Sequence, residues 1–360
     1  MNGLSLTLLI LTAVVAVVTL LPLSRFSHWA IRGWDFPRLQ LSVVSLALLV
    51  ANFSLAEVND WWWLVILSQC LCLAYHSAWI LPYTQLLPSQ VKRLARLPQA
   101  QRQSASHIRV MCANVLESNR RSKRLLEIVH KQRPDILVAV ETDDWWMDEL
   151  DELTDDYPHV LRCPQDNLYG MLVYSVWPLE DASIEYIVQD GIPSMHFQLN
   201  LPGDHRIAMH CVHPAPPSPI ENTFSLPRDA ELVKLASRVQ DCSLPVIVAG
   251  DLNDVAWSRT TRLFRKISGL LDPRLGRGAY NTFHAKVPFL RWPLDHVFHS
   301  EHFALVEMKR LPAFGSDHFP ILIELALLAE APAQQTPEQS TAEQRQEAAD
   351  IVAREAAMSE

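Results

Sequence analysis

The first part of the chain, residues 1–83, alternates long apolar runs with short polar loops. The first run, at 4–23, has about the 20 residues that a helix needs to cross a bilayer. Runs at 40–56 and 61–83 follow, and aromatic side chains lie at both ends of the last one, as in a membrane aromatic belt. The first run lacks a basic leader and a small-residue cleavage site, which argues against a cleaved signal peptide. Core helices are the alternative for the other two runs, but we expect three transmembrane helices.

Basic residues are unevenly distributed over the loops that join these runs. Arg25, Arg32 and Arg38 lie between the first two runs, whereas the loop between the second and third has no lysine or arginine. More basic residues follow the third run, at Lys92, Arg93, Arg96 and Arg102. Because positively charged loops remain in the cytoplasm, the pattern predicts an integral multi-pass protein whose later residues are cytoplasmic.

Beyond a polar linker at 84–106, short aliphatic strands alternate with helical segments as far as residue 328. Residues 107–115 and 135–141 have the pattern of buried strands, and the segment between them has apolar positions at helical spacing. Strands mixed with helices over this length predict an α/β domain, residues 107–328, in which helices cover sheets.

Composition narrows the remaining possibilities. The formal net charge of −9 gives no general affinity for nucleic acid. The six cysteines form no CxxC pair, which argues against a disulfide scaffold or a thiolate zinc site. The last segment, 329–360, is a low-complexity stretch of Ala, Glu and Gln with no evident apolar face, and we expect it to be a disordered tail.

Polar residues recur at the ends of the aliphatic runs of the α/β region. They are Asn114, Glu141, His213, Asp251, Asn253, Asp295, Asp317 and His318. A single acid at a strand end is usually a turn residue or a helix cap. A whole set in this position indicates a binding site, because ligands of open α/β sheets bind beyond the strand ends.

The segments that carry these residues also form a recognisable series. In chain order they read CANV, VAVET, CVHPAPP, AGDLND, PLDHVF and GSDHFP. This series resembles the endonuclease/exonuclease/phosphatase superfamily, the metal-dependent phosphoesterases related to DNase I. The resemblance covers residues 107–325 and implies a four-layer α/β/β/α sandwich of two mixed β-sheets, here preceded by three transmembrane helices.

Glu141 is the best candidate metal ligand, with the amide of Asn114 beside it. Carboxylate and amide oxygens suit Mg²⁺ or Mn²⁺, and the resemblance implies that Asp317 completes this acidic site. The alternative for Glu141 is a solvated acid at the start of a helix.

Asp251 and Asn253 are two positions apart, so in a strand their side chains would point to the same side. By resemblance, Asp251 orients the attacking water or contacts the metal, and Asn253 donates a hydrogen bond to a phosphoryl oxygen. The resemblance also implies that His318 is the general base, that Asp295 holds its tautomer, and that His213 binds the phosphate or assists as a proton donor.

The substrate is less well defined by the sequence. A phosphate ester of a nucleic acid, a nucleotide or a phospholipid headgroup fits the resemblance, and we expect nuclease-like chemistry first. The alternatives are a lipid or inositol-phosphate phosphatase, a phospholipase C-like enzyme, and a non-catalytic scaffold. Arginines between residues 259 and 291 either rim the cleft or form a solvated helix face. The bilayer is the other expected partner, and no protein partner is indicated.

Overall fold

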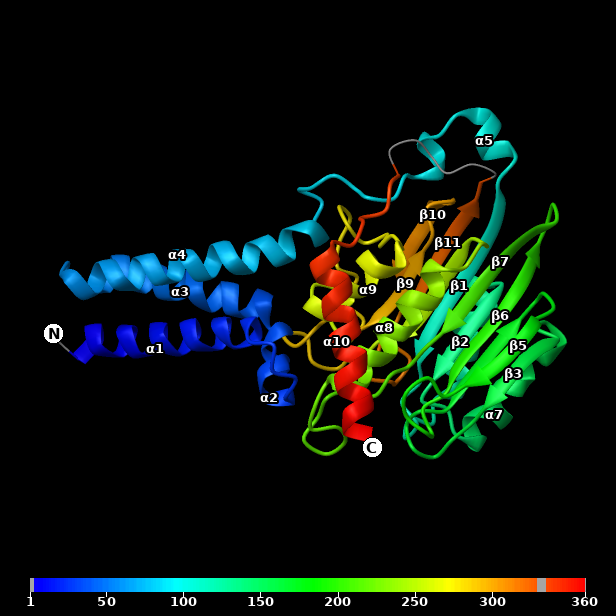
Figure 1. The fold of residues 1–360 in the computed structure, drawn as a ribbon, viewed down its shortest axis with the longest axis horizontal. Helices are drawn as coiled ribbons and strands as arrows, with labels where there is room; N and C mark the ends of the chain where they lie inside the picture. Colours follow the sequence, from blue (N-terminus) through cyan, green and yellow to red (C-terminus); the bar gives the residue numbers. More distant parts are fainter. Residues whose placement is uncertain (1–2, 329–334, 360) are drawn as a thin grey trace.

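A bundle of three long helices extends from one end of an α/β domain (Figure 1). The computed structural model describes residues 3–328 and 335–359. The bundle consists of α1 (Gly3–Leu20), α3 (Arg38–Leu55) and α4 (Asp60–Ile80), which contact one another pairwise. With the short turns that continue α1 and α4, these helices are long and apolar enough to cross a membrane, with mean hydropathies of 2.7, 1.5 and 1.7.

The bundle has an inverted distribution of polar and apolar side chains. Its interior includes Thr12, Ser45, Gln69 and His76, and the His76 ring lies 3.0 Å from the Thr19 hydroxyl. Its outer surface carries leucine, valine and phenylalanine side chains that are about half exposed. A soluble bundle has the opposite arrangement, whereas small and polar residues are common between helices that lipid surrounds.

The bundle is attached to the α/β domain by side chains at the helix ends. The loop between α1 and α3 contains the short helix α2 (Trp29–Arg32), and the Trp257 indole donates to the Asp35 carbonyl in this loop at 2.9 Å. After α4, the Tyr83 hydroxyl donates to the Ala256 carbonyl at 2.5 Å. The segment predicted as a linker is packed against the domain too, since Val91 is fully buried.

Two mixed sheets form the centre of the domain. The six-stranded sheet has the order β10-β11-β1-β2-β4-β3, and the five-stranded sheet has the order β5-β6-β7-β8-β9. Among the strands of the described residues, β1–β2 and β7–β8 pair in parallel and the other neighbouring pairs are antiparallel. The strands are β1 (Ser106–Asn114), β2 (Ile136–Val140), β3 (His159–Cys163), β4 (Met171–Ser175), β5 (Glu180–Glu185), β6 (Ser194–Leu201), β7 (His205–Cys211), β8 (Val246–Asp251), β9 (Asp295–His299), β10 (Phe303–Arg310) and β11 (Ile321–Leu327).

The sheets pack face to face, with helices on both outer faces, and this confirms the predicted four-layer sandwich. Alternate residues of β1 show the layering. Val110 and Cys112 point into the core between the sheets, and Met111 points to the outer face. The six-stranded sheet is covered by α6 (Ser122–Gln132) and α7 (Asp144–Leu150), and the five-stranded sheet by α8 (Leu226–Gln240) and α9 (Arg259–Ser268).

The expectation of a disordered tail is wrong for the C-terminal segment. Residues 335–341 lead into α10 (Ala342–Ser359), which packs on α8 and α9 (Figure 1). Ala348 is buried there, with Ile351 and Val352 packed against the same core. An ion pair of 2.5 Å joins Arg259 to Glu347. Ala348, Ile351 and Val352 are spaced by three and four residues and thus form a narrow apolar face that composition alone did not reveal. Residues 329–334 of the predicted tail lie outside the described residues.

Gly250 allows β8 to approach the end of β7 closely. Its φ is +147°, and a Cβ there would lie 1.9 Å from the Val212 carbonyl oxygen. Gly278 has a similar φ of +151°, but a Cβ there would make only ordinary contacts with Tyr280. Substitution of each glycine by alanine therefore distinguishes the cost of backbone strain, present at both positions, from the cost of a collision, present only at Gly250.

We expect Gly278→Ala to lower the free energy of unfolding by about 1–3 kcal/mol, through backbone strain alone. Gly250→Ala should cost more, beyond about 4 kcal/mol, because the carbonyl that it meets belongs to a core strand end and cannot move aside. Thermal unfolding of the full chain in detergent compares the two variants. Equal thermal midpoints in the two variants would contradict the predicted collision between a Cβ at position 250 and the Val212 carbonyl.

Candidate active site

The segment GDLN places Asp251 at the end of β8 and Asn253 in the turn that follows. Asp251 is buried, and its carboxylate accepts a hydrogen bond from the Asn253 backbone N–H at 2.9 Å. Asn253 has a φ of +51°, so it lies beyond the strand and the two-residue periodicity of a strand does not apply to it. A turn, not the strand pleat, directs both side chains to the same region.

His318 lies between two buried carboxylates. Its Nδ1 is 2.8 Å from an Asp295 oxygen, and its Nε2 is 3.5 Å from an Asp251 oxygen. Burial alone would lower the pKa of His318, but the charges of Asp295 and Asp251 outweigh it and raise this pKa to about 10. The Phe283 ring packs on the imidazole with 4.9 Å between the ring centres. The imidazole is thus fixed in orientation and holds its proton at neutral pH.

Asn114 and Glu141 meet Asp251 from the other sheet. The Asn114 amide nitrogen donates to Glu141 at 2.6 Å and to Asp251 at 3.1 Å, while its oxygen accepts from the Leu116 N–H. Burial raises the pKa of Glu141 to about 8, against the opposing effect of the Asn114 hydrogen bond. In this arrangement the amide nitrogen of Asn114, rather than its oxygen, faces the carboxylates.

Asp317 is half-buried beside this group, and its neighbour Ser316 connects two parts of the site. The Ser316 hydroxyl donates to the Asn114 carbonyl at 2.8 Å and accepts from the His318 N–H at 3.0 Å. The charge of Asp317 contributes to the raised pKa values of both Glu141 and His318. Sequence reasoning passed over Ser316, although it lies inside the GSDHFP segment.

His213 lies on the Asn253 side of the site. The Asn253 amide nitrogen donates to His213 Nε2 at 3.1 Å and to the Pro214 carbonyl at 3.0 Å. Burial lowers the pKa of His213 to about 4, so the ring is neutral. Because Nε2 accepts from Asn253, the proton of the ring is on Nδ1. Nδ1 has no hydrogen-bond partner among the described residues, and the Tyr169 ring lies alongside with 5.5 Å between the ring centres.

Two supporting residues gave no recognisable signal in the sequence. The Thr282 hydroxyl accepts from the Asp295 N–H at 3.2 Å. Arg228 is buried in α8 and donates to the Asn253 carbonyl at 2.7 Å, so it holds the turn that follows β8. Both act through the backbone of a site residue, which a sequence pattern does not reveal.

Taken together, these contacts bring all eight predicted site residues into one region at the edge of the two sheets.

The acidic residues of this region fit a divalent cation. The closest grouping is Asp251, Asp295 and His318, whose ligand atoms lie within 4.8 Å of one another. Glu141 and Asp251 share one amide, and among the described residues neither carboxylate has an ion pair with lysine or arginine. Buried carboxylates that pair with no lysine or arginine suit Mg²⁺ or Mn²⁺.

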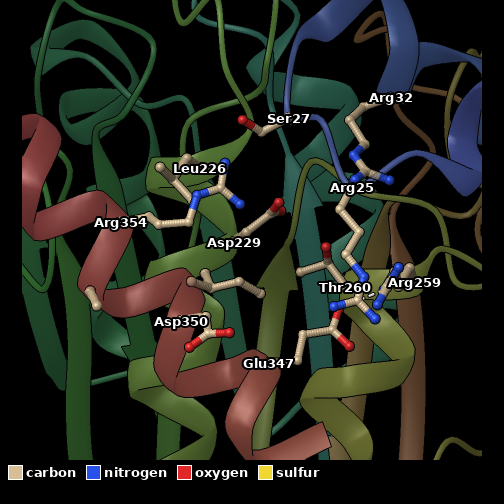
Figure 2. A pocket seen from close by; sticks show the side chains of 12 residues that line it. Arg25, Ser27, Arg32, Leu226, Asp229, Arg259, Thr260, Glu347, Asp350 and Arg354 are labelled. Atoms are coloured by element: carbon tan, nitrogen blue, oxygen red, sulfur yellow. Dashed lines mark ion pairs between the residues drawn. The ribbon is translucent and has the colours of Figure 1, made fainter. Parts of the chain in front are cut away.

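A separate cavity of about 270 Å³ lies where the loop after α1 meets α8, α9 and α10 (Figure 2). Arg25, Arg259 and Arg354 project into it, together with the carboxylates of Glu347 and Asp350. Arg259 and Glu347 pair with each other across it. None of the predicted site residues lines this cavity, so it belongs to the attachment of the bundle and α10 rather than to the candidate active site.

The sequence model of the endonuclease/exonuclease/phosphatase family matches residues 111–318, which contain all of these site residues. The chain belongs to this family. Its members are phosphoesterase hydrolases. No curated protein matches the chain.

Solved structures show the same fold. An endonuclease/exonuclease/phosphatase from Beutenbergia cavernae DSM 12333 is 18% identical with a TM-score of 0.51, over 63% of this chain and 73% of that chain. The human nocturnin catalytic domain with bound sulfate is 18% identical with a TM-score of 0.51, over 62% of this chain and 94% of that chain. D. rerio TDP2 complexed with single-strand DNA product is 16% identical with a TM-score of 0.53, over 61% of this chain and 99% of that chain. At these identities the likeness concerns the fold alone.

Neutralising Glu141 tests the charge balance of the site. Because its pKa is raised from 4.5 to about 8, the folded protein loses stability as pH rises through this window. We expect Glu141→Gln, in EDTA above pH 8, to raise the free energy of unfolding by at most about 5 kcal/mol, and the thermal midpoint with it, and to have no effect near pH 4. The same substitution should abolish stabilisation by Mg²⁺ or Mn²⁺.

Glu231, on α8, provides the matched control, because burial also raises its pKa to about 8. Glu231→Gln should stabilise the protein at high pH and leave the response to metal intact. If Glu141→Gln also kept a full metal response, Glu141 would not be a ligand.

Proposed function

We propose that this protein is a membrane-anchored, divalent-metal-dependent phosphoesterase in which His318 activates the attacking water. The observation that carries the proposal is the buried Asp295–His318–Asp251 arrangement beside the Asn114–Glu141 pair. One carboxylate orients the imidazole, and the neighbouring acids Glu141 and Asp251 pair with no lysine or arginine among the described residues. This arrangement combines a general base with a cation site. Nucleic-acid phosphodiesters and lipid headgroup phosphates offer the same reacting group, and the proposal covers both.

His318 is the general base in this proposal. Asp295 occupies Nδ1, which leaves Nε2 as the atom that takes a proton from water. Because Asp251 helps to hold His318 in its protonated form, the base is released only when the charge of Asp251 is offset.

Glu141, Asp251 and Asp317 are the residues that would hold Mg²⁺ or Mn²⁺. Such a cation would supply positive charge to neutralise a phosphoryl oxygen and to offset the charge of Asp251. Asn114 keeps Glu141 and Asp251 in place through its two hydrogen bonds.

The neutral His213 is the proposed donor to a phosphoryl oxygen. Its Nδ1–H has no partner among the described residues, whereas both amide hydrogens of Asn253 are used by His213 and Pro214. Asn253 therefore acts by positioning His213, and not by contacting phosphate itself as the resemblance implied.

We further infer that the three apolar helices span a membrane. Their lengths, the polar interior of the bundle and its apolar surface support this. The arginine-rich loop after α1 and the basic segment after α4 both lie on the side of the α/β domain, and the positive-inside rule then makes that side cytoplasmic.

Replacing the base or its acidic neighbour tests the reaction. We expect His318→Gln to lower metal-dependent hydrolysis of bis-p-nitrophenyl phosphate at least about 100-fold, because general base catalysis is lost. Asp251→Asn should lower it to a similar extent, because a carboxylate that would hold the cation is lost. EDTA should abolish the activity of the unmodified chain. His299→Gln is the control, because His299 is buried at the far end of the same strand as Asp295. Full activity in folded His318→Gln would contradict the mechanism.

Orientation has its own test. A green fluorescent protein fused to the C-terminus of the bacterially expressed chain should fluoresce, whereas alkaline phosphatase at the same point should be inactive. The opposite pair of results would place the α/β domain outside.

A further inference from the structure

The candidate active site is connected to the start of α3 by a hairpin at residues 283–292. Backbone hydrogen bonds from Phe283 to Trp292 and from His284 to Leu290 close this hairpin. At its base, Phe283 packs on His318, and the Ala285 N–H donates to the Asp317 carbonyl at 2.6 Å. The hairpin is therefore a wall of the site.

The hairpin also contacts the start of the apolar bundle, through both its base and its tip. Trp292 packs edge-to-face on Phe36, two residues before α3 begins, with 5.6 Å between the ring centres. Gln40, in the first turn of α3, donates to the Phe289 carbonyl at 2.8 Å. The tip of the hairpin is thus beside the first turn of a helix that, by the proposed function, enters the membrane.

A second loop, at residues 214–224, makes a similar connection from the His213 side of the site. It follows His213 directly, and its end is bonded to the loop after α1. The Trp29 N–H donates to the Thr223 carbonyl at 3.0 Å, and Phe224 packs edge-to-face on Phe26. Both walls of the site are therefore anchored to loops at the end of the bundle.

Each of these loops exposes a large apolar side chain. Ile220 is 89% exposed and Phe289 is 85% exposed, the two highest values for large apolar residues within residues 107–328. Leu290 is also half exposed beside Phe289, and Lys286 and Arg291 flank the pair. Apolar side chains between cations are typical of segments that insert into the interface of an anionic membrane.

Nucleic acid is the other class of substrate that the chemistry allows. A nucleic-acid groove presents basic side chains along the path of the backbone. Here the most exposed large apolar side chains of the α/β domain, Ile220 and Phe289, lie one on each loop, and the formal net charge of the chain is −9. These features favour a bilayer over a polyanion at the mouth of the site.

We propose that the candidate active site hydrolyses a phosphate ester carried by a lipid in the bilayer, with Phe289 and Ile220 inserted in the interface on either side of its mouth. The inference rests on the proposed function and names its substrate class. Water adds to phosphorus, the bond from phosphorus to the leaving oxygen breaks, and the proton that His318 takes from water ends on that oxygen. The lipid remains anchored by its chains throughout.

Two substrates with one scissile bond test this. Ethyl p-nitrophenyl phosphate is soluble in water, and hexadecyl p-nitrophenyl phosphate inserts into vesicles of phosphatidylcholine and phosphatidylglycerol. With the full chain reconstituted in these vesicles, we expect kcat/KM for the hexadecyl ester to exceed that for the ethyl ester at least tenfold. The double variant Phe289→Ser/Ile220→Ser should lose most of this preference while its rate on the ethyl ester stays within twofold.

The double variant keeps all three apolar helices, so the concentrating effect of the anchor is the same in both proteins. Met358→Ser, on α10, controls for loss of an exposed apolar side chain elsewhere. A preference that survives in the double variant, or none in the unmodified chain, would overturn the lipid inference while His318-dependent turnover of the ethyl ester left the proposed function intact. Absence of turnover on both esters would contradict the proposed function itself.

Discussion

The candidate active site depends on the face-to-face packing of the two sheets. Asn114 ends a strand of the six-stranded sheet and Asp251 ends a strand of the five-stranded sheet, and only this packing brings their side chains within 3.1 Å. The 2.8 Å contact between His318 and Asp295 also crosses from one sheet to the other. A shift of one sheet against the other would separate the His318 imidazole from the Asp295 carboxylate and the Asn114 amide from Asp251. The apolar core between the sheets therefore determines the geometry of the polar site at its edge.

The same site concentrates charge at the expense of stability. Burial raises the pKa of Glu141 to about 8, and two carboxylates raise that of His318 to about 10. Among the described residues no arginine or lysine pairs with Glu141 or Asp251, although Asp254, three residues further along, lies 3.5 Å from Arg228. Arg228 thus pairs with Asp254 and supports the turn after β8, whereas Glu141 and Asp251, where a cation would bind, have no such partner in the described part of the chain. A site built for structure alone would pair its acids.

The sequence predicted the parts of the fold that have a strong periodic signal. Continuous aliphatic runs revealed the central strands, and the three apolar helices agree with their expected ranges within a few residues. The strands β3 and β5 were missed, because both are edge strands with half-exposed side chains and no aliphatic run. The eight site residues were found from their positions at strand ends, but their partners were not. Hydrogen bonds such as Asn253 to His213 span 40 residues and depend on a turn whose φ the pattern does not encode.

The central claim is that this group of residues delivers water to phosphorus. Hydrolysis of bis-p-nitrophenyl phosphate by the full chain in water enriched in ¹⁸O, with Mg²⁺ or Mn²⁺, tests it most directly, and mass spectrometry of the products locates the label. The account predicts one ¹⁸O in the p-nitrophenyl phosphate and none in the p-nitrophenol, with at least about 100-fold less labelled product from His318→Gln. Label in the p-nitrophenol, or an equal amount of labelled product from His318→Gln, would contradict it.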